Sequence, residues 1–343
     1  MRAPYRIGLL GLGHVGGALA RRLIEDGERV ASAAGRPIIL DAIAVARPQG
    51  RTAPASLVPA DALLKRPHLD AIVELIGGID PALTYICSAL QSGLEVITAN
   101  KQLIAARGPA LAQLGPLRFE ASVASAIPIV ETLAETLAAD RINSLIGILN
   151  GTTNSILDAM AAGADYADAL ADAQRCGLAE ADPSADVDAH DPAAKLAILG
   201  MLGFRRRIEP SQIERVGIRG LDQRQLVAAR ERGFVVKLIA AASMTGPGIE
   251  ADVRPRLIPD DAPLARVAGP MNAISVDAAY AGTLVLQGPG AGPDAAASAV
   301  LADLIRAARG TPASAGALLA SLADQPVATI TPLGLQTPFP AVP

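Results

Sequence analysis

A glycine turn near the N-terminus constrains the fold of this chain more than any other feature. Residues 5–10, YRIGLL, predict a short buried strand, and the sequence GLGHVG follows it and opens a helix that extends to about Asp26. In this context the first glycine permits a tight turn, the second lets the backbone approach a pyrophosphate, and the third lets the helix pack on the strand. The free N–H groups and positive dipole end of the helix favour the same ligand. The pattern predicts a dinucleotide site formed by Gly11, Leu12, Gly13, His14, Val15 and Gly16.

Strands and helices alternate through the rest of the N-terminal part. Apolar stretches predict further strands at 40–46, 70–76, 95–98 and 117–123, and a helix over 81–92 lies among them. Such alternation is typical of a parallel sheet that carries helices on both faces. We therefore expect an α/β fold in which residues 1–143 form a Rossmann-type dinucleotide-binding domain.

The pattern changes after residue 143. Several strands with few helices between them favour an α+β domain over residues 144–287, which we expect to supply the substrate site and the dimerisation surface. A helix within 288–310 would return the chain to the first domain. Residues 311–343 are rich in alanine and proline, and we expect much of this tail to be loosely held.

Composition excludes several classes of protein. The 343 residues include only two cysteines, Cys87 and Cys176, which make neither a disulfide framework nor a metal-binding pattern. A net charge of −4 without a basic stripe argues against a nucleic-acid partner. No apolar run approaches the length of a membrane helix, and the N-terminus lacks the pattern of a signal peptide. We expect a cytoplasmic protein that acts on a small-molecule substrate and has no membrane partner.

The end of the second predicted strand bears on the choice of cofactor. An NAD site usually has an acidic residue there, which binds the ribose hydroxyls. This chain instead reads AVAR, with Arg47 as the charged residue. A guanidinium suits the 2′-phosphate of NADP, although an arginine in a solvated loop would fit the sequence equally well. The sequence favours NADP and leaves NAD open.

A second chemical signal is the segment 177–195, GLAEADPSADVDAHDPAAK, which combines several carboxylates with one amine. Asp191 followed by proline predicts a helix start with Asp191 as N-cap. Lys195 lies four residues later and therefore shares a helix face with Asp191. The positive end of the helix dipole disfavours an ammonium there, and an amine that releases its proton readily serves as a general acid or base. A surface lysine fits the same spacing, and Glu180 equally suits an exposed loop.

Eight motifs occur in order along the chain. They are GLGHVG (11–16), VELIGG (73–78), TANK (98–101), EASVASAIPIV (120–130), ILNGTTN (148–154), GLAEADP (177–183), DPAAK (191–195) and GPGAG (288–292). In this order they resemble the homoserine dehydrogenase family, in a short form without an added C-terminal regulatory domain. The resemblance covers nearly the whole chain. It implies the reversible, NAD(P)-dependent interconversion of L-aspartate 4-semialdehyde and L-homoserine, in the biosynthesis of threonine and methionine.

The resemblance also implies roles for individual residues. Lys195 would donate a proton to the aldehyde oxygen in the reductive direction, and Asp191 would bind substrate and position Lys195. Glu180 would bind the substrate amino group, with Gly177 close by. Lys101 would lie where the nicotinamide meets the substrate. The further cofactor contacts that it implies are Gly77, Gly78 and Gly292.

The family holds a monovalent cation such as sodium in a loop. The residues that would form this site here are Glu120 and the carbonyls of Val123, Ser125 and Ile127. Family members usually have two flexible residues, often Gly-Gly, where this chain has Ser125-Ala126, so the added Cβ atoms would reshape the loop or weaken cation binding. Leu178 replaces a common tyrosine, and residues 188–190 lack a common glycine, which leaves room for a different substrate.

The sequence is therefore compatible with three functions. The first is homoserine dehydrogenase, and the second is a related oxidoreductase for another small amino or hydroxy aldehyde. The third is a non-catalytic cofactor-binding protein, against which the presence of Lys101, Asp191 and Lys195 counts. In the enzymatic cases we expect a homodimer or homotetramer.

Overall fold

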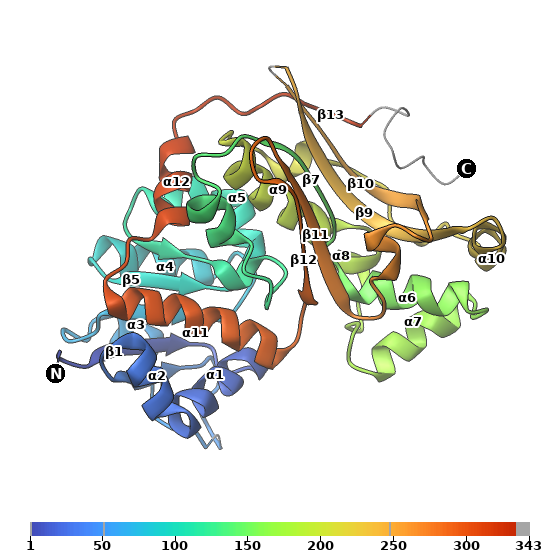
Figure 1. Ribbon diagram of the computed structural model, residues 1–343. Coiled ribbons are helices and arrows are strands. Elements are labelled where there is room, and N and C mark those ends of the chain that lie inside the picture. The colour runs from blue at the N-terminus through green and yellow to red at the C-terminus, as the bar shows by residue number, and fades with distance from the viewer. Residues whose placement is uncertain (1, 51, 247, 334–343) are drawn as a thin grey trace. The chain divides into compact units, whose positions relative to one another are not determined.

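The computed structural model describes residues 2–50, 52–246 and 248–333, and these divide into two compact units (Figure 1). The first unit comprises the described residues up to Thr136 together with Gly292–Gln325. The second unit comprises Leu137–Ala291 and the described residues from Pro326 onward. Among the helices that these ranges contain, none is long and apolar enough to cross a membrane.

A parallel sheet forms the centre of the first unit. Its strands are β1 (Tyr5–Leu10), β2 (Ile38–Ala44), β3 (Ser56–Val58), β4 (Ala71–Glu74), β5 (Glu95–Thr98) and β6 (Leu117–Arg118). They follow the order β3-β2-β1-β4-β5-β6, and each neighbouring pair is parallel. The strand order reverses between β1 and β4, and in open α/β sheets the ligand crevice lies at the carboxyl ends of the strands flanking such a point.

Helices cover this sheet and complete its core. They are α1 (His14–Glu25), α2 (Gly27–Ala34), α3 (Ala60–Leu64), α4 (Ala82–Gln91), α5 (Lys101–Ala112), α11 (Pro293–Arg309) and α12 (Ser314–Leu322). Helix α11 packs against α1 and α2, and α12 packs against α5 and β6 (Figure 1). Leu304 of α11 joins Leu9, Leu19 and Ile97 in one fully buried apolar cluster, so the C-terminal helix helps to hold the N-terminal sheet together.

A mixed sheet organises the second unit. Its strands are β7 (Ile142–Ile148), β8 (Glu214–Arg215), β9 (Phe234–Thr245), β10 (Gly248–Pro259), β11 (Met271–Ala278), β12 (Gly282–Pro289) and β13 (Ile330–Thr331). The main order is β12-β11-β7-β9-β10-β13, and β8 also pairs with β10. The long strands are antiparallel, whereas the short strands β8 and β13 are parallel to β10.

Helix α9 brings charge into the interior of the second unit. The helices here are α6 (Gly151–Ala161), α7 (Tyr166–Arg175), α8 (Ser184–Val187), α9 (His190–Phe204) and α10 (Gln223–Glu231). Helices α6, α9 and α10 pack against β9, and α7 packs against α6. Because α9 is apolar on nearly all sides and buried along its length, it is an interior helix. Asp191 and Lys195 in its first turns are therefore buried charges.

The two expected fold classes are both present, but several elements differ from the sequence predictions. The strand predicted over 117–123 stops at Arg118, and a 3₁₀ helix, η1 (Glu120–Ser122), follows it. Helix α9 begins at His190, so Asp191 is not its N-cap. The boundary between units falls after Thr136 rather than after 143. The segment from 311 contains α12 and β13, and residues 334–343 of the predicted tail lie outside the described residues.

Candidate active site

The glycine turn after β1 is tightly packed on one side and open on the other. Gly11 has φ +100°, and a Cβ there would lie 2.7 Å from the Leu75 carbonyl oxygen. A Cβ on Gly16 would lie 2.2 Å from the Gly11 carbonyl oxygen. A Cβ on Gly13, by contrast, would meet nothing within 4 Å. The packing of the turn thus requires Gly11 and Gly16, while Gly13 leaves space at the N-terminus of α1, where unpaired N–H groups suit an anion.

A cleft of about 700 Å³ extends from this turn along the carboxyl ends of β1, β2 and β4. Leu12, Arg47 and Tyr85 contribute to its lining. Arg47 is exposed and lies three residues beyond the end of β2, and no acidic residue stands between Ala44 and Arg47. The open glycine, the helix N-terminus and a guanidinium at one end of the cleft fit a dinucleotide that carries several phosphates. His14 and Val15 begin α1 beside the turn.

A buried carboxylate shapes the loop after β4. Glu74 is fully buried, and its Oε1 accepts hydrogen bonds from the N–H groups of Ile76 at 2.7 Å and Gly77 at 2.9 Å. Its Oε2 accepts a bond from the hydroxyl of Thr98 at 2.6 Å. Gly77 and Gly78 have φ of +80° and +73°, a conformation that favours glycine. Glu74 therefore holds the end of VELIGG against the end of β5.

Asn100 continues this network to the start of α5. Its Nδ2 donates to the Gly78 carbonyl at 2.6 Å, and its Oδ1 caps the helix by accepting from the Leu103 N–H at 3.1 Å. Lys101 follows as the first helical residue and is half-buried. The loop after β4 and the TANK motif after β5 are thus one hydrogen-bonded assembly, which the sequence had shown only as two separate motifs.

The loop proposed for a monovalent cation has an unusual backbone. Ala124 and Ser125 have φ of +51° and +39°, which lie in the left-handed region that side chains with a Cβ disfavour. The positions whose backbone favours glycine are therefore 124 and 125. The sequence had indicated Ser125-Ala126, one residue later. Val123, Ser125 and Ile127 are buried, and the Ile127 carbonyl accepts a bond from the Ile129 N–H at 2.8 Å.

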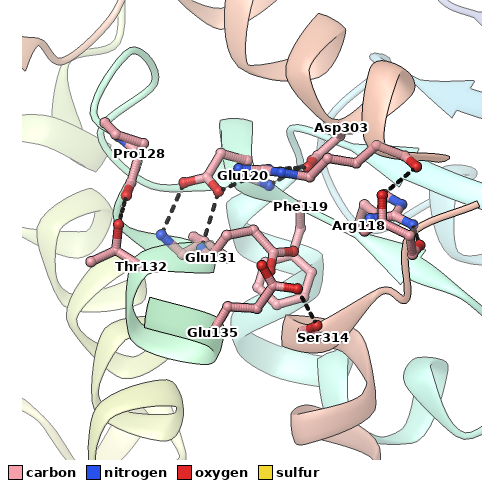
Figure 2. Close-up of polar contacts among 12 residues, drawn as sticks. Arg118, Phe119, Glu120, Pro128, Glu131, Thr132, Glu135, Asp303 and Ser314 are labelled. Carbon is pink, nitrogen blue, oxygen red and sulfur yellow. Dashed lines mark hydrogen bonds and ion pairs between the residues drawn. The ribbon is translucent and has the colours of Figure 1, made fainter. Parts of the chain in front are cut away.

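The Glu120 carboxylate is occupied by the chain itself (Figure 2). Its oxygens accept hydrogen bonds from the N–H groups of Val130 at 2.9 Å and Glu131 at 3.1 Å. Its own N–H donates to Asp303 of α11 at 2.9 Å. Glu120 thus fastens the segment after the loop to α11, and each of its carboxylate oxygens already accepts one main-chain hydrogen bond.

Three buried carboxyls, those of Glu120, Glu131 and Asp303, gather around Arg306. The Arg306 Nη1 lies 3.2 Å from Asp303 and 3.5 Å from Glu120, so one guanidinium serves two carboxyls. Burial raises the pKa of Asp303 to about 7 and that of Glu131 to about 6, and it also raises the pKa of Glu120. Protons therefore compensate part of this cluster near neutral pH. Within the described part of the chain, no group of three or more His, Cys, Asp or Glu side chains is arranged to hold a metal ion.

Lys195 and Asp191 form a buried pair in the second unit. The Lys195 ammonium lies 2.9 Å from Asp191 Oδ2 and donates to the Leu149 carbonyl at 2.7 Å. Lys195 is 6% exposed and Asp191 is 5% exposed. This burial excludes the surface lysine that the spacing also allowed. Buried charges persist only with such partners, because removing them from water is costly.

The connection from β7 to α6 surrounds this pair. Asn150 is the N-cap of α6, and its Nδ2 donates to Asp191 Oδ2 at 2.8 Å and to Asp186 Oδ1 at 2.6 Å. Gly151 follows, and a Cβ there would lie 2.4 Å from the Pro270 carbonyl oxygen. The ILNGTTN motif therefore supplies contacts to both members of the buried pair.

The loop between α7 and α8 carries the predicted substrate residues. Gly177 has φ +71° and is exposed, as is Glu180. The Thr152 hydroxyl donates to the Leu178 carbonyl at 2.8 Å, which ties this loop to the N-terminus of α6. Gln174 Nε2 donates to the Glu180 carbonyl at 3.0 Å. The loop is thus fixed at its backbone while the Glu180 side chain faces solvent.

The residue before α9 adopts a strained conformation. Ala189 is fully buried and has φ +63°, in the left-handed region. Ala189 falls within residues 188–190, where the resemblance implied a glycine, and its backbone has a conformation that suits glycine. Gly292, the other predicted cofactor residue outside the N-terminal segment, is the N-cap of α11 in the first unit with φ +115°.

Sequence reasoning missed the residues that support the site. Asn150, Asp186, Glu74 and Asn100 received no role, because each acts through contacts with residues far away in the chain. One signal was available, since an asparagine directly before a predicted helix is typical of an N-cap. Asn100 and Asn150 both follow that rule.

Two sequence models of known families match the chain. The one described as homoserine dehydrogenase matches residues 128–305, and the one described as homoserine dehydrogenase, NAD binding domain, matches residues 11–116. The homoserine dehydrogenase of Corynebacterium glutamicum is 44% identical over 318 residues, which cover 88% of this chain and 72% of that protein.

Solved structures give the same result. A homoserine dehydrogenase from Thiobacillus denitrificans superimposes with a TM-score of 0.89 at 36% identity, over 96% of this chain and 80% of that one. A hyperthermophilic archaeal homoserine dehydrogenase in complex with NADPH superimposes with a TM-score of 0.72 at 26% identity, over 90% of this chain and 99% of that one.

Proposed function

This chain belongs to the homoserine dehydrogenase family and is an oxidoreductase with an NAD-binding domain, and on that premise we propose how its residues perform the reaction. The reaction interconverts L-aspartate 4-semialdehyde and L-homoserine. In the reductive direction a hydride goes to the aldehyde carbon and a proton to its oxygen. The observation that carries the proposal is the buried Lys195–Asp191 pair, with its 2.9 Å separation.

Lys195 is the proton donor in this proposal. Its contacts with the Asp191 carboxylate and the Leu149 carbonyl are both to acceptors, which suit a protonated ammonium. That ammonium can transfer a proton to the aldehyde oxygen as the oxygen gains negative charge. In the reverse direction the amine accepts the proton of the homoserine hydroxyl. Asp191 keeps the ammonium oriented throughout and also contacts the substrate.

The substrate ammonium is assigned to Glu180. An exposed carboxylate on a loop that is anchored at its backbone is available to a ligand, and a charge-assisted contact would form when substrate covers it. Gly177 begins the same loop and has a left-handed backbone that lets the chain pass close to substrate. Lys101, at the start of α5, is the proposed contact near the reacting carbon.

The cofactor of this proposal is NADP. When bound, the reduced cofactor supplies the hydride. Arg47 is exposed at the edge of the cleft, and the absence of an acidic residue after β2 within the cleft's described lining removes the usual partner of an NAD ribose. The archaeal relative whose structure contains NADPH is consistent with this assignment.

A monovalent cation such as sodium would bind through main-chain carbonyls of the loop 123–127. The left-handed backbone at Ala124 and Ser125 changes the direction in which successive carbonyl groups of the loop point. The loop is also largely buried. Such a cation would brace the loop and take no part in proton or hydride transfer.

A steady-state assay of homoserine oxidation, run separately with NADP and NAD, tests the proposal. We expect turnover with both cofactors and a higher kcat/KM with NADP. Arg47→Asp should shift the ratio of the two kcat/KM values toward NAD, because it removes the phosphate contact and adds a carboxylate for the ribose. The exposed Arg29→Asp in α2 is the control for a change of charge alone. An unchanged ratio in Arg47→Asp would contradict the assignment of NADP.

A further inference from the structure

Asn150 lies at the junction of β7 and α6, where its orientation is fixed. It is 5% exposed. Its Oδ1 accepts hydrogen bonds from the Thr153 N–H at 2.8 Å and from the Thr153 hydroxyl at 2.9 Å. Because the amide oxygen is engaged in capping α6, the amide nitrogen must point the other way. The cap therefore determines what the rest of the side chain can do.

The amide nitrogen of Asn150 joins two carboxylates. One N–H group donates to Asp186 Oδ1 at 2.6 Å and the other to Asp191 Oδ2 at 2.8 Å. The two carboxylates share this one amide group, and the Lys195 ammonium lies 2.9 Å from Asp191. A neutral donor between them satisfies oxygen atoms without adding charge.

The neighbouring residue holds the other member of the pair. The Leu149 carbonyl accepts the bond from Lys195 at 2.7 Å, while Asn150 binds Asp191, which itself lies 2.9 Å from Lys195. Lys195 and Asp191 belong to one helix, α9, and the dipeptide Leu149-Asn150 belongs to another segment. The ammonium and its carboxylate are thus both fixed from outside their own helix.

We infer that Asn150 is a positioning residue for proton transfer: its amide orients Asp191 and thereby holds the Lys195 ammonium toward the reacting oxygen. The inference rests on the proposed acid–base role of Lys195. Only asparagine combines the required groups at this length, since Asp and Ser also cap helices but lack an N–H₂ group. A glutamine or histidine is too long for the same N-cap geometry.

Asn150→Asp tests this inference. Aspartate caps α6 as well as asparagine does, so the N-terminus of α6 should be retained. The variant loses both donors and places a third carboxylate beside Asp186 and Asp191, close to Lys195. We expect kcat to fall about 10²-fold, the scale of a misplaced reacting group. The alkaline limb of the kcat profile for aldehyde reduction should move to higher pH, because an added negative charge favours the ammonium form of Lys195.

The matched control is Asn143→Asp on β7, the strand that precedes Asn150. Asn143 Nδ2 also donates to a carboxylate, that of Asp277, at 3.0 Å, but it is not part of the Lys195 cluster. This control should leave kcat and its pH profile unchanged. If Asn150→Asp matches the control in both readouts, the inference is wrong. Asn150→Ser keeps the cap without the added charge and should lower kcat without the alkaline shift, so it decides the matter if the aspartate variant does not fold.

Lys195→Ala separates this inference from the proposed function. In one outcome Lys195→Ala abolishes turnover, while both Asn150 variants behave like Asn143→Asp. The acid–base role of Lys195 is then supported, and only the positioning role of Asn150 is wrong. If Lys195→Ala retains near wild-type turnover, the acid–base assignment falls, and the role of Asn150 falls with it.

Discussion

The cofactor cleft of the first unit and the buried acid–base pair of the second are built by different means. The glycine turn at one part of the cleft is made by backbone geometry within a few consecutive residues, Gly11 to Gly16, at the end of one strand. The buried pair is made by side chains from β7–α6, α8 and α9, which are joined by hydrogen bonds of 2.6–2.9 Å. Adding a Cβ to a glycine should therefore disrupt the first region. Removing a charge or a hydrogen-bond donor should disrupt the second.

The difference also predicts how each region fails. A steric change at the glycine turn acts on packing and then on cofactor binding. A polar change in the second unit acts on the chemical step, while the apolar contacts of α9 keep the fold. Five substitutions examine this contrast, from the largest expected effect to the smallest.

Lys195→Ala should have the largest effect. We expect kcat to fall by about 10²-fold to 10⁴-fold, the range for loss of a general acid. Cofactor binding, measured by fluorescence titration with NADPH, should stay within about twofold because the dinucleotide cleft lies in the first unit. Near wild-type turnover would remove Lys195 from the mechanism.

Gly16→Ala and Gly13→Ala should separate packing from ligand binding within one turn. The Gly16 Cβ would lie 2.2 Å from a backbone oxygen, so we expect a loss of about 1–3 kcal/mol in the free energy of unfolding. The Gly13 Cβ meets nothing within 4 Å, so stability should change little while the Kd for NADPH rises at least about tenfold. Urea unfolding and cofactor titration measure the two quantities. Equal destabilisation by both variants would contradict the geometry of the turn.

Glu180→Gln should affect substrate recognition rather than structure. Loss of a charge-assisted contact costs about 1.5–3 kcal/mol, or roughly tenfold to a hundredfold in kcat/KM. The variant should impair homoserine far more than 4-hydroxybutanoate, which lacks the amino group. Asp182→Asn, on the same exposed loop, is the control and should alter neither substrate selectively. An equal loss on both substrates would overturn the role of Glu180.

Ala189→Gly should have the smallest effect and shows where backbone geometry enters the second region. Glycine relieves the left-handed strain at φ +63°, worth about 1–2 kcal/mol, and this offsets the lost methyl contact and the greater freedom of the unfolded chain. Stability should therefore stay within about 0.5 kcal/mol of the starting protein. Ala193→Gly, in the regular part of α9, carries the same losses without the relief and should cost about 1–2 kcal/mol. Equal costs in urea unfolding would show that Ala189 is not strained.

The sequence predicted those parts of the molecule that depend on neighbours in the chain. The glycine turn, α1 and the parallel sheet follow from local patterns, and the i, i+4 spacing of Asp191 and Lys195 placed both on one face of α9. The start of α9 was predicted incorrectly, because the proline after Asp191 is also tolerated two positions further into the first turn.

The remainder could not be predicted because its causes lie far apart in the chain. The contact between Asn150 and Asp191 spans 41 residues, and the bond from Glu120 to Asp303 spans 183. No local rule links such pairs. The roles of Glu180, Lys101 and the loop 123–127 came from family resemblance, and they remain predictions.

The carboxyls around Arg306 make the folding of the first unit a reaction that takes up protons. In an unfolded chain the carboxyls of Asp303 and Glu131 have ordinary pKa values near 4, whereas burial raises them to about 7 and about 6 in the folded unit. Between these limits the folded form binds more protons, so their contribution to stability is complete below about pH 4 and is lost as pH rises through 6 to 7. Unfolding near pH 6 should release protons into the solvent. The calorimetric enthalpy of unfolding should then vary with the ionisation enthalpy of the buffer.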